Sequence, residues 1–517
     1  CKGKQHFTQK HLHLLRSHMY QHNEKQLKFE NFSIPFGGHL RSDNRWVRLA
    51  KLIPWHEIET IYASTLSGTG QGAPALSARV ALGALIIKER LGTSDEETVE
   101  QIRENPYLQY FLGLYEYSHE RVFHSTMFVH FRKRFPAEAF KKINELIAKK
   151  AMDATADKTE DDDSDKDDGN THGNGTGNKG KLIVDATCAP EDINYPTDLK
   201  LLNKAREQSE LIIDILHKKM PAGSKKPRTY RIKARKNYLQ ISKSRRANKK
   251  NIRKAIRKQL GYLARNLKSI AKQNDYVCLT NLDKRQYKTL LVISELHRQQ
   301  KWMYDQRSRR IDDRIVSINK PHVRPIKRGK AGADTEFGAK ISASLVNGYI
   351  FADRISWNNF NESTDLIDQI ETYKSRMGFY PESVHADKIY RNRGNIRYCK
   401  KYGIRLSGPR LGRPPKQTEA NKEQLQAAKQ LARQDELDRI PIEGKFGQSK
   451  RRFSLSRIMT KLSCTSETSI VLIFIVVNLE KWLKAILLFL FSKGEISRRF
   501  AIFTDFLSLN EPVLCEV

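Results

Sequence analysis

The sequence predicts a mixed α+β protein, with a helical N-terminal domain followed by an α/β domain that a long basic helical insertion interrupts. Residues 51–152 carry short helical patterns separated by tight breaks, which is typical of a compact helical domain. Residues 340–357 carry two alternating strand-like runs around Asn347-Gly348, the preferred two-residue turn of a β-hairpin. Residues 199–335 are helical in composition and strongly basic. A hairpin followed by alternating helices and strands favours a mixed sheet in the second domain.

The amino-acid composition restricts the kind of molecule that the protein is expected to bind. The chain has 517 residues, enough for two or three domains, and a formal net charge of +35. A charge of this size favours a polyanion, and nucleic acid over an anionic membrane. The six cysteines lie far apart without a C-x-x-C pair, which favours reduced thiols in a cytosol over a zinc ribbon or a disulfide framework. No secretory signal pattern opens the sequence, so we expect a cytoplasmic protein.

One apolar run, residues 470–491, has the length of a membrane span. Asn478, Glu480 and Lys481 interrupt it, and the apolar stretches on either side are too short to cross a hydrocarbon layer of about 30 Å. We therefore expect a buried core strand or helix here and no membrane contact.

The N-terminal region divides into an arm and a helical domain. Residues 1–50 are basic with little periodicity, so we expect a partly ordered arm. In the helical domain that follows, Ser94 and Glu97 have the spacing of a capping box at a helix start. Short helices, one of which carries Arg132 and Lys133, suit a helix-turn-helix-like DNA reader, and a plain helical bundle is the alternative.

A linker precedes the α/β domain. Residues 153–180 are acidic and then rich in Gly and Asn. The acidic run fails as a calcium loop because Asp168 stands where that loop requires Gly, so a flexible linker is expected. Residues 181–198 then form the first part of the α/β domain, beginning with a strand.

The insertion, residues 199–335, carries the densest positive charge. Between residues 225 and 268 Lys and Arg are frequent and Asp and Glu are absent, so this block can neutralise many phosphates. A basic solvated helix pair without a specific role is the alternative. Its candidate DNA contacts are Lys225, Arg228, Arg235, Lys236, Arg245 and Arg246.

The rest of the α/β domain is predicted to span residues 336–495, with a C-terminal tail at 496–517. The pattern after the hairpin predicts helix 362–376, strand 381–386, helix 389–401 and strand 403–407. Residues 414–434 have the composition of a polar connector. We expect the next helix to begin at Asp438 as its N-cap, with Pro441 in its first turn.

Two aspartates follow predicted strands of this domain. Asp185 comes directly after the strand 181–184, and Asp387 comes directly after the strand 381–386. Ligands of open α/β sheets bind at the carboxyl ends of the strands, so these two side chains are expected to be neighbours.

Arg439, Glu443 and Lys450 supply a third carboxylate and two cations. Steps of four and eleven residues return to within about 40° of one direction on a helix, so the three side chains share a face. Taken alone, a surface helix with incidental salt bridges is the alternative. With Asp185 and Asp387, Glu443 can hold two Mg²⁺ ions, which suit phosphodiester transfer. No protein nucleophile competes, because the cysteines lack evident partners and no G-x-S-x-G is present.

The motifs around these residues resemble a known family. They are LIVDATCAPEDINYPTD around Asp185, GADTEFGAKI before the hairpin, HADKIYRNRGN around Asp387 and RIPIEGKFGQSKRRFSLSRI around Glu443. Together they resemble bacterial insertion-sequence transposases with an RNase H-like DDE domain, in the InsH-like branch of the insertion sequence 5 family. The segment from LIPWHEIETIYA to ENPYLQYFLGL resembles the domain that precedes the catalytic domain in these enzymes.

Related transposases carry a Y-x2-R-x3-E-x6-K signature, in which the glutamate is the third metal ligand. Arg439, Glu443 and Lys450 match its last three positions, whereas Glu436 stands at the tyrosine position. The resemblance implies that Arg439 and Lys450 contact transposon-end DNA. It also favours Glu443 over Glu436 as the metal ligand, because only Glu443 has the matching arginine and lysine.

The resemblance implies a transposase that binds the terminal inverted repeats of its element and cuts there with two Mg²⁺ ions, for which Mn²⁺ can substitute. It then joins the 3′-hydroxyl to target DNA, so the nucleophile is water or a DNA 3′-hydroxyl. A homodimer on paired ends of double-stranded DNA, associated with the nucleoid, is expected. The alternatives are an RNase H-like nuclease that cuts without joining and an inactive, transposase-derived DNA-binding protein. Arg391 and Arg393, in HADKIYRNRGN, are further candidate DNA contacts.

Overall fold

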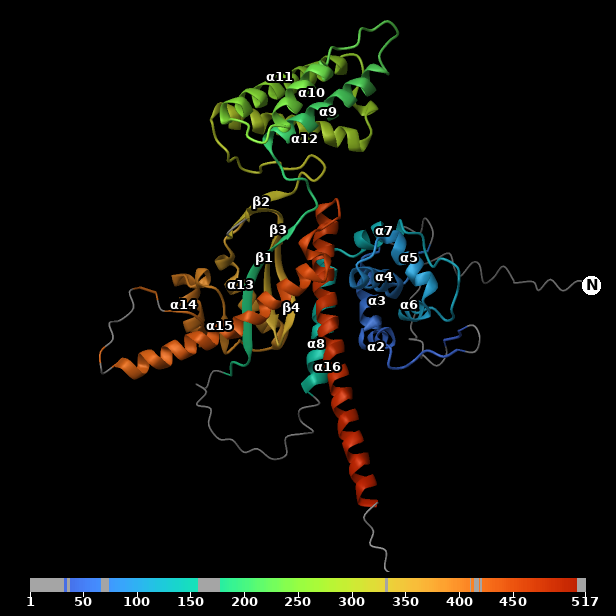
Figure 1. Ribbon diagram of the computed structural model, residues 1–517, viewed down its shortest axis with the longest axis vertical. Coiled ribbons are helices and arrows are strands. Elements are labelled where there is room, and N and C mark those ends of the chain that lie inside the picture. Colours follow the sequence, from blue (N-terminus) through green and yellow to red (C-terminus); the bar gives the residue numbers. More distant parts are fainter. Residues whose placement is uncertain are drawn as a thin grey trace, which may run out of the picture.

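The computed structural model describes residues 32–34, 38–66, 74–156, 177–330, 333–409, 411–412, 418 and 421–508. Most of the expected N-terminal arm, residues 157–176 of the expected linker and the last residues of the expected tail, 509–517, lie outside the described residues. In the part of the chain that the structure describes, helices combine with one six-stranded sheet, as the mixed class requires (Figure 1).

The N-terminal domain is a group of short helices beside the long helix α16 (Figure 1). The Ser94 hydroxyl accepts from the Glu97 amide, so the predicted N-cap is confirmed. Gly92 ends the preceding helix at φ +69°, a conformation that glycine adopts without steric cost. The helices are α2 (Arg45–Leu52), α3 (Trp55–Ser64), α4 (Ala78–Leu91), α5 (Asp95–Glu104), α6 (Pro106–Phe111), α7 (Met127–Arg134) and α8 (Ala137–Ala156).

The sheet is built around β3, its longest strand, which pairs on one side with β1 and on the other with β2 and β4. The β1–β3, β2–β3 and β3–β4 pairs are antiparallel, whereas β1–β5 and β5–β6 are parallel. Asn347 and Gly348 both have positive φ between β3 and β4, so the predicted hairpin turn is confirmed. The strands are β1 (Lys181–Pro190), β2 (Arg324–Lys330), β3 (Ala333–Val346), β4 (Tyr349–Ser356), β5 (Ser383–His385) and β6 (Arg405–Leu406).

Two strand predictions are wrong. Asp185 does not follow the end of its strand, because β1 continues to Pro190. The extension exists because β3 pairs with β1 over its whole length, from Leu182 to Pro190, which a local pattern does not reveal. In addition, β2 lies inside the range expected to be a helical insertion, where it forms an edge of the sheet against β3.

The last helix of the α/β domain is also longer than predicted. Helix α15 spans Lys422–Arg451, so its N-terminus is well before Asp438 and Pro441 lies in its interior. Residues 422–437 consist largely of good helix formers, which extends the helix backwards. Pro441 is exposed, and the carbonyl that its missing N–H leaves unpaired belongs to the exposed Leu437, so the cost is reduced by solvent.

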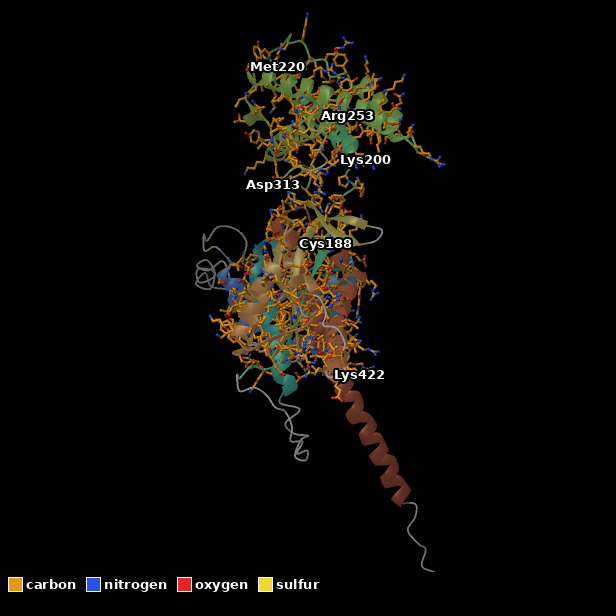
Figure 2. The ribbon with its side chains drawn as sticks, turned by 90° about the vertical axis from the view of Figure 1, so that its left-hand side faces the viewer. Cys188, Lys200, Met220, Arg253, Asp313 and Lys422 are labelled. Atoms are coloured by element: carbon orange, nitrogen blue, oxygen red, sulfur yellow. The ribbon has the colours of Figure 1, made fainter. Side chains whose placement is uncertain are left out.

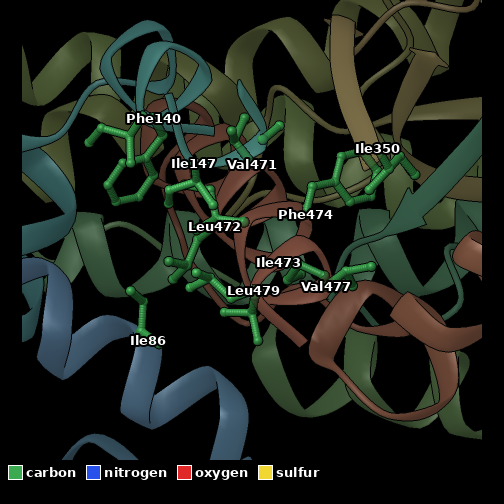
Figure 3. Packing of buried hydrophobic residues seen from close by; sticks show 14 of the residues in the cluster. Ile86, Phe140, Ile147, Ile350, Val471, Leu472, Ile473, Phe474, Val477 and Leu479 are labelled. Atoms are coloured by element: carbon green, nitrogen blue, oxygen red, sulfur yellow. The ribbon is translucent and has the colours of Figure 1, made fainter. Parts of the chain in front are cut away.

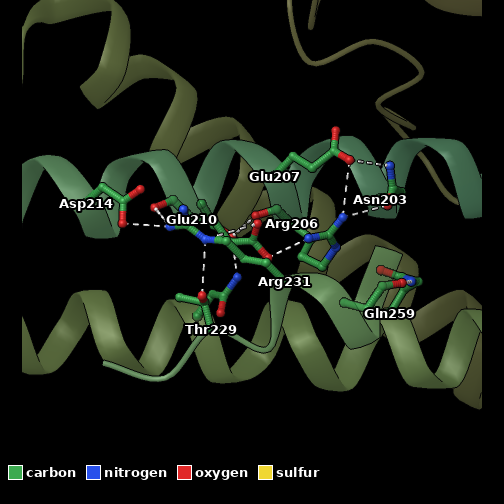
Figure 4. Close-up of polar contacts among 11 residues, drawn as sticks. Asn203, Arg206, Glu207, Glu210, Asp214, Thr229, Arg231 and Gln259 are labelled. Atoms are coloured by element: carbon green, nitrogen blue, oxygen red, sulfur yellow. Dashed lines mark hydrogen bonds and ion pairs between the residues drawn. The ribbon is translucent and has the colours of Figure 1, made fainter. Parts of the chain in front are cut away.

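The insertion forms a helical module above the sheet, built from α9 (Asp198–His217), α10 (Arg231–Ser242), α11 (Lys249–Asn274) and α12 (Lys284–Asp305) (Figure 1). Figure 2 shows Asp313 between this module and Cys188, which lies near the end of β1. Two small apolar clusters hold the helices together. An ionic network adds to them: Arg206 contacts Glu210 at 2.5 Å, and Arg231 contacts Asp214 at 2.6 Å (Figure 4).

Two further helices, α13 (Leu366–Met377) and α14 (Arg393–Lys401), complete the α/β domain, and α16 (Ser463–Ser508) joins the domains. Ile470, Phe474 and Val477 of α16 are fully buried, and they pack with α4, α8 and β4 in one core (Figure 3). The prediction of a buried core strand or helix in this apolar run is therefore confirmed as far as Leu483, and the element is a helix. In the part of the chain that the structure describes, no helix is long and apolar enough to cross a membrane.

Candidate active site

A cleft of about 1000 Å³ lies at the edge of the sheet where β1 and β5 diverge, and α15 forms one of its walls. Its acidic lining residues are Asp185, Glu362, Asp387 and Glu443, and its basic ones are Lys327, Lys340, Arg439 and Lys450. The five residues predicted for the catalytic centre from the sequence are thus among those that line one cleft.

Asp185 lies in the floor of the cleft because of the sheet register. The parallel pairing of β1 with β5 ends at Ile183 and His385, whereas the antiparallel pairing with β3 continues, with Asp185 opposite Ala343. Asp185 therefore stands just past the end of the parallel pair, although it is in the middle of its own strand. Its Oδ1 accepts from the Ala186 amide at 2.7 Å.

The environment of Asp185 disfavours its charged form. Burial raises the pKa of Asp185 to about 6, and the nearby carboxylates of Glu362 and Glu443 act in the same direction. The Ala186 amide and the Arg439 guanidinium oppose this rise. A cation bound beside Asp185 would favour the carboxylate, so the site is electrostatically suited to a positively charged ligand.

Asp387 and Glu443 both form ion pairs with Arg439. Asp387 follows β5 by two residues and accepts from the Lys388 amide at 2.7 Å at the start of a 3₁₀ turn. One turn apart on α15, Arg439 and Glu443 form an ion pair at 3.2 Å, and the Arg439 Nη1 atom lies 3.1 Å from Asp387 Oδ1. A single guanidinium thus pairs with both carboxylates.

Helix α15 is held against the sheet by a polar clamp just before Arg439. Lys181 of β1 contacts Asp438 at 2.7 Å, and Arg405 of β6 contacts Asp435 at 2.8 Å. Buried His385 of β5 lies 3.4 Å from Asp435, and its burial lowers its pKa, which keeps the ring neutral near pH 7. The clamp fixes where α15 crosses the strand ends, and therefore where Glu443 enters the cleft.

The donor chemistry of the cleft fits a hard divalent cation, because its candidate ligands are carboxylates and the described residues that line it include neither His nor Cys. Among the described residues, however, no three His, Cys, Asp or Glu side chains are close enough together to hold one metal ion. Arg439 accounts for part of this separation, since it lies against both Asp387 and Glu443.

Sequence reasoning missed three charged cleft residues, Lys327, Lys340 and Glu362. Lys340 and Glu362 form an ion pair at 3.2 Å, and Lys340 also donates to the Phe360 carbonyl at 2.8 Å. A signal for Glu362 was present, because the predicted hairpin makes β4 run in the same direction as β1. The segment after β4 therefore reaches the edge of the sheet where Asp387 lies. No pattern in the sequence indicated that Lys340 would line the cleft.

Glu436, the other acidic candidate on α15, is exposed and is absent from the cleft lining. It precedes Glu443 by two helical turns, about 10 Å along the helix axis. The geometry therefore agrees with the preference for Glu443, and the assignment of the third ligand stays a prediction.

The candidate DNA-contact residues outside the cleft divide into two groups. Arg391 donates to the carbonyls of Leu406 and Ser407, and Arg132 pairs with Asp95 at 2.7 Å, so both guanidinium groups already bind within the protein. The remaining candidates are exposed and available to a polyanion: Lys133, Lys225, Arg228, Arg235, Lys236, Arg245, Arg246 and Arg393.

Carboxylates and cations gathered at one edge of a mixed sheet suit an enzyme that acts on phosphodiesters. A family model described as a transposase DDE domain matches residues 384–480, which include Asp387, Arg439, Glu443 and Lys450. A second model, a transposase domain (DUF772), matches residues 35–134. Both matches are to domains of transposases, and together they support an insertion-sequence DDE transposase.

A curated relative is less informative about function. The chain is 28% identical over 159 residues to an uncharacterised protein, ORF8 of the nfe locus of Rhizobium meliloti. The alignment covers 31% of this chain and 68% of that protein. No solved structure matches the chain significantly.

Proposed function

We propose that the protein binds the terminal inverted repeats of its insertion element, cleaves the DNA there and joins the freed 3′-hydroxyl to target DNA. The observation that carries this proposal is the convergence of Asp185, Asp387 and Glu443, from three separate segments, on a cleft that also contains Arg439 and Lys450. The InsH-like branch of the insertion sequence 5 family and an RNase H-like catalytic domain are part of the proposal.

Asp185, Asp387 and Glu443 would hold the divalent metal, Mg²⁺ or Mn²⁺, as two ions. When bound, such a pair activates the attacking oxygen and stabilises the leaving one. The protein's own contribution is to place three carboxylates on rigid elements and to exclude other donors. Arg439 and Lys450 would bind the phosphates of the transposon end on either side of the scissile bond. For the carboxylates to accept metal, Arg439 must release Asp387 and Glu443 and turn toward DNA phosphate.

The other basic elements would hold DNA outside the cleft. Exposed cations of α10, α11 and the segments flanking them can neutralise backbone phosphates without reading sequence. The helices of residues 51–152 would read the inverted repeat, with Lys133 of α7 as an exposed contact. A homodimer on paired ends, acting at the nucleoid in the cytoplasm, completes the proposal.

The test is an assay of the purified full-length chain on duplexes that carry the element's own ends, with Mg²⁺, flanking DNA and a target plasmid. A transposase gives end-specific cleavage and then joined products. Cleavage without joining would favour the RNase H-like nuclease, and end binding without cleavage would favour an inactive DNA-binding derivative. Absence of both binding and cleavage would reject the proposal.

A further inference from the structure

The last turn of α4, in the N-terminal domain, contacts the chain immediately after the candidate catalytic helix. Both carboxylate oxygens of Glu89 accept hydrogen bonds from Ser454: Oε1 from the amide and the hydroxyl, and Oε2 from the hydroxyl, all at 2.8 Å. Ser454 is only three residues beyond the end of α15 at Arg451 and four beyond Lys450 of the cleft.

The next residue of α4, Arg90, reinforces this contact through a second, mostly buried group of ion pairs. Arg90 Nε lies 2.6 Å from Glu480 Oε1 of α16, and Arg452 Nη2, directly after α15, lies 3.2 Å from Glu480 Oε2. The guanidinium of Arg90 also stacks over Trp46 of α2, 4.8 Å from the ring centroid. Arg90 and Glu480 are almost fully buried, so movement of Glu480 would leave the buried charge of Arg90 without its carboxylate partner.

Lys88, the residue before Glu89, connects the last turn of α4 to the basic helix α7. Lys88 pairs with Asp95 at 3.0 Å, and Asp95 also pairs with Arg132 of α7 at 2.7 Å. Three consecutive residues of α4 therefore contact three places: the helices expected to read DNA, the chain after α15, and the central helix α16.

Helix α15 is in this way fixed at two positions with the candidate site between them. The clamp formed by Asp435 and Asp438 holds it to the sheet. Just beyond its end, Ser454 contacts Glu89 of the N-terminal domain, and Arg452 pairs with Glu480 of α16. The cleft residues Arg439, Glu443 and Lys450 all lie within this interval. A shift or rotation of the helix end would move Lys450 directly and Glu443 with it.

We propose that Glu89 and Arg90 are positioning residues for catalysis: the N-terminal domain sets the orientation of α15 in the active site in addition to binding DNA. The proposal rests on the proposed function. Its physical basis is that a misplacement of about 1 Å at a reacting group is enough to cost about a hundredfold in rate. The domain that reads the DNA ends is thereby held in a fixed position relative to the catalytic cleft.

The test compares Glu89→Gln and Ser454→Ala with Ser454→Thr, which keeps the hydroxyl, and with Glu104→Gln, a control at an exposed carboxylate of the same domain. Single-turnover cleavage is measured at saturating end DNA, together with the Kd for that DNA. We expect Glu89→Gln and Ser454→Ala to cleave about 10- to 100-fold more slowly. The Kd should stay within about threefold of the wild-type value.

The double variant should be no slower than the slower single variant, because both changes remove the same interaction. Ser454→Thr and Glu104→Gln should cleave at the wild-type rate. Wild-type cleavage by Glu89→Gln, or a loss of cleavage that only follows a loss of DNA affinity, would overturn the proposal.

A second measurement separates this inference from the proposed function. Amide hydrogen exchange of residues 445–452 is compared in the wild type, Glu89→Gln and Glu104→Gln without DNA. We expect the amides of residues 445–452 to exchange faster in Glu89→Gln alone, and the amides around Asp435 in the polar clamp to exchange at the same rate in all three proteins. Unchanged exchange would overturn the inference even if the wild type cleaves DNA. A wild type that does not cleave would reject the proposed function and leave this measurement to decide the positioning role.

Discussion

The Nη1 atom of Arg439 lies 3.1 Å from Oδ1 of Asp387, although the two residues come from a helix and from the loop after a strand that it crosses. The same guanidinium also pairs with Glu443. Without DNA, an arginine expected to bind the substrate therefore pairs with two of the three expected metal ligands. Under the proposed function, this arrangement would couple substrate binding to metal binding, because a phosphate that attracts Arg439 would also free carboxylate oxygens.

Replacement of Arg439 tests this coupling. Arg439→Ala should weaken the complex with end DNA by about 1–2 kcal/mol, or about 5- to 30-fold, because it removes a charge-assisted hydrogen bond to phosphate. Arg439→Lys keeps the charge but not the planar fork, so it should recover only part of the affinity. Gel-shift titrations at fixed salt measure both. Wild-type affinity of Arg439→Ala would remove this residue from the DNA interface.

Asp185 should make the metal-free protein less stable at neutral pH than in mild acid. Its pKa of about 6 in the folded protein lies above the value of about 3.9 in an unfolded chain, so the folded state binds its proton more tightly. This contribution to stability is fully present below about pH 4 and is lost as the pH rises through about 6.

Asp185→Asn should therefore stabilise the metal-free protein at pH 7.5 by up to about 3 kcal/mol and have little effect at pH 4. Urea unfolding in a chelator at both pH values measures the difference, with Glu104→Gln as the control. An equal effect of Asp185→Asn at the two pH values would show that the carboxyl does not titrate in this window.

The two glutamates of α15 should behave differently. Glu443→Gln should abolish strand cleavage and leave end binding largely intact, because an amide is a poor substitute for a carboxylate ligand. Glu436→Gln should cleave normally, because Glu436 is exposed and lies outside the cleft lining. Cleavage assays on end duplexes decide between them. Cleavage by Glu443→Gln together with loss of cleavage in Glu436→Gln would make Glu436 the third metal ligand.

The basic insertion should contribute salt-dependent affinity without sequence preference. Replacing Arg235, Lys236, Arg245 and Arg246 by Ala should lower the slope of log K against log salt by about 0.9 for each phosphate that the protein then leaves unneutralised. The affinity should fall by a similar factor for end DNA and unrelated DNA. The control is Lys301→Ala on α12, where the lysine is already paired with Asp305 at 2.9 Å. An unchanged slope would show that the insertion does not touch DNA.

Features encoded by neighbouring residues were predictable from the sequence. The Asn347-Gly348 turn requires two residues that tolerate positive φ, and the sequence supplies them. Ser94 caps a helix because its hydroxyl reaches an amide three residues on. Asn478, which interrupts the apolar run of α16, is buried and satisfied by the backbone of Ile350 and by Asn144, so a polar residue there is compatible with a core helix.

Features that depend on distant partners were not predictable. The extension of β1 past Asp185 depends on β3, and β2 is a strand because β3 offers it an edge. Its sequence, RPIKRGK, has no strand-like alternation. The three carboxylates could be grouped from their places after strands and on one helix face, but the position of Arg439 between two of them depends on where α15 crosses the sheet.

The proposed function is tested most directly by strand cleavage at the element's own ends by the wild type, Asp185→Asn and Asp387→Asn in Mg²⁺, with end binding measured in parallel. We expect all three proteins to bind the ends, the wild type to cut and join them, and neither variant to cut. Cleavage by either variant at the wild-type rate, or a wild type that binds its ends and never cuts them, would contradict it.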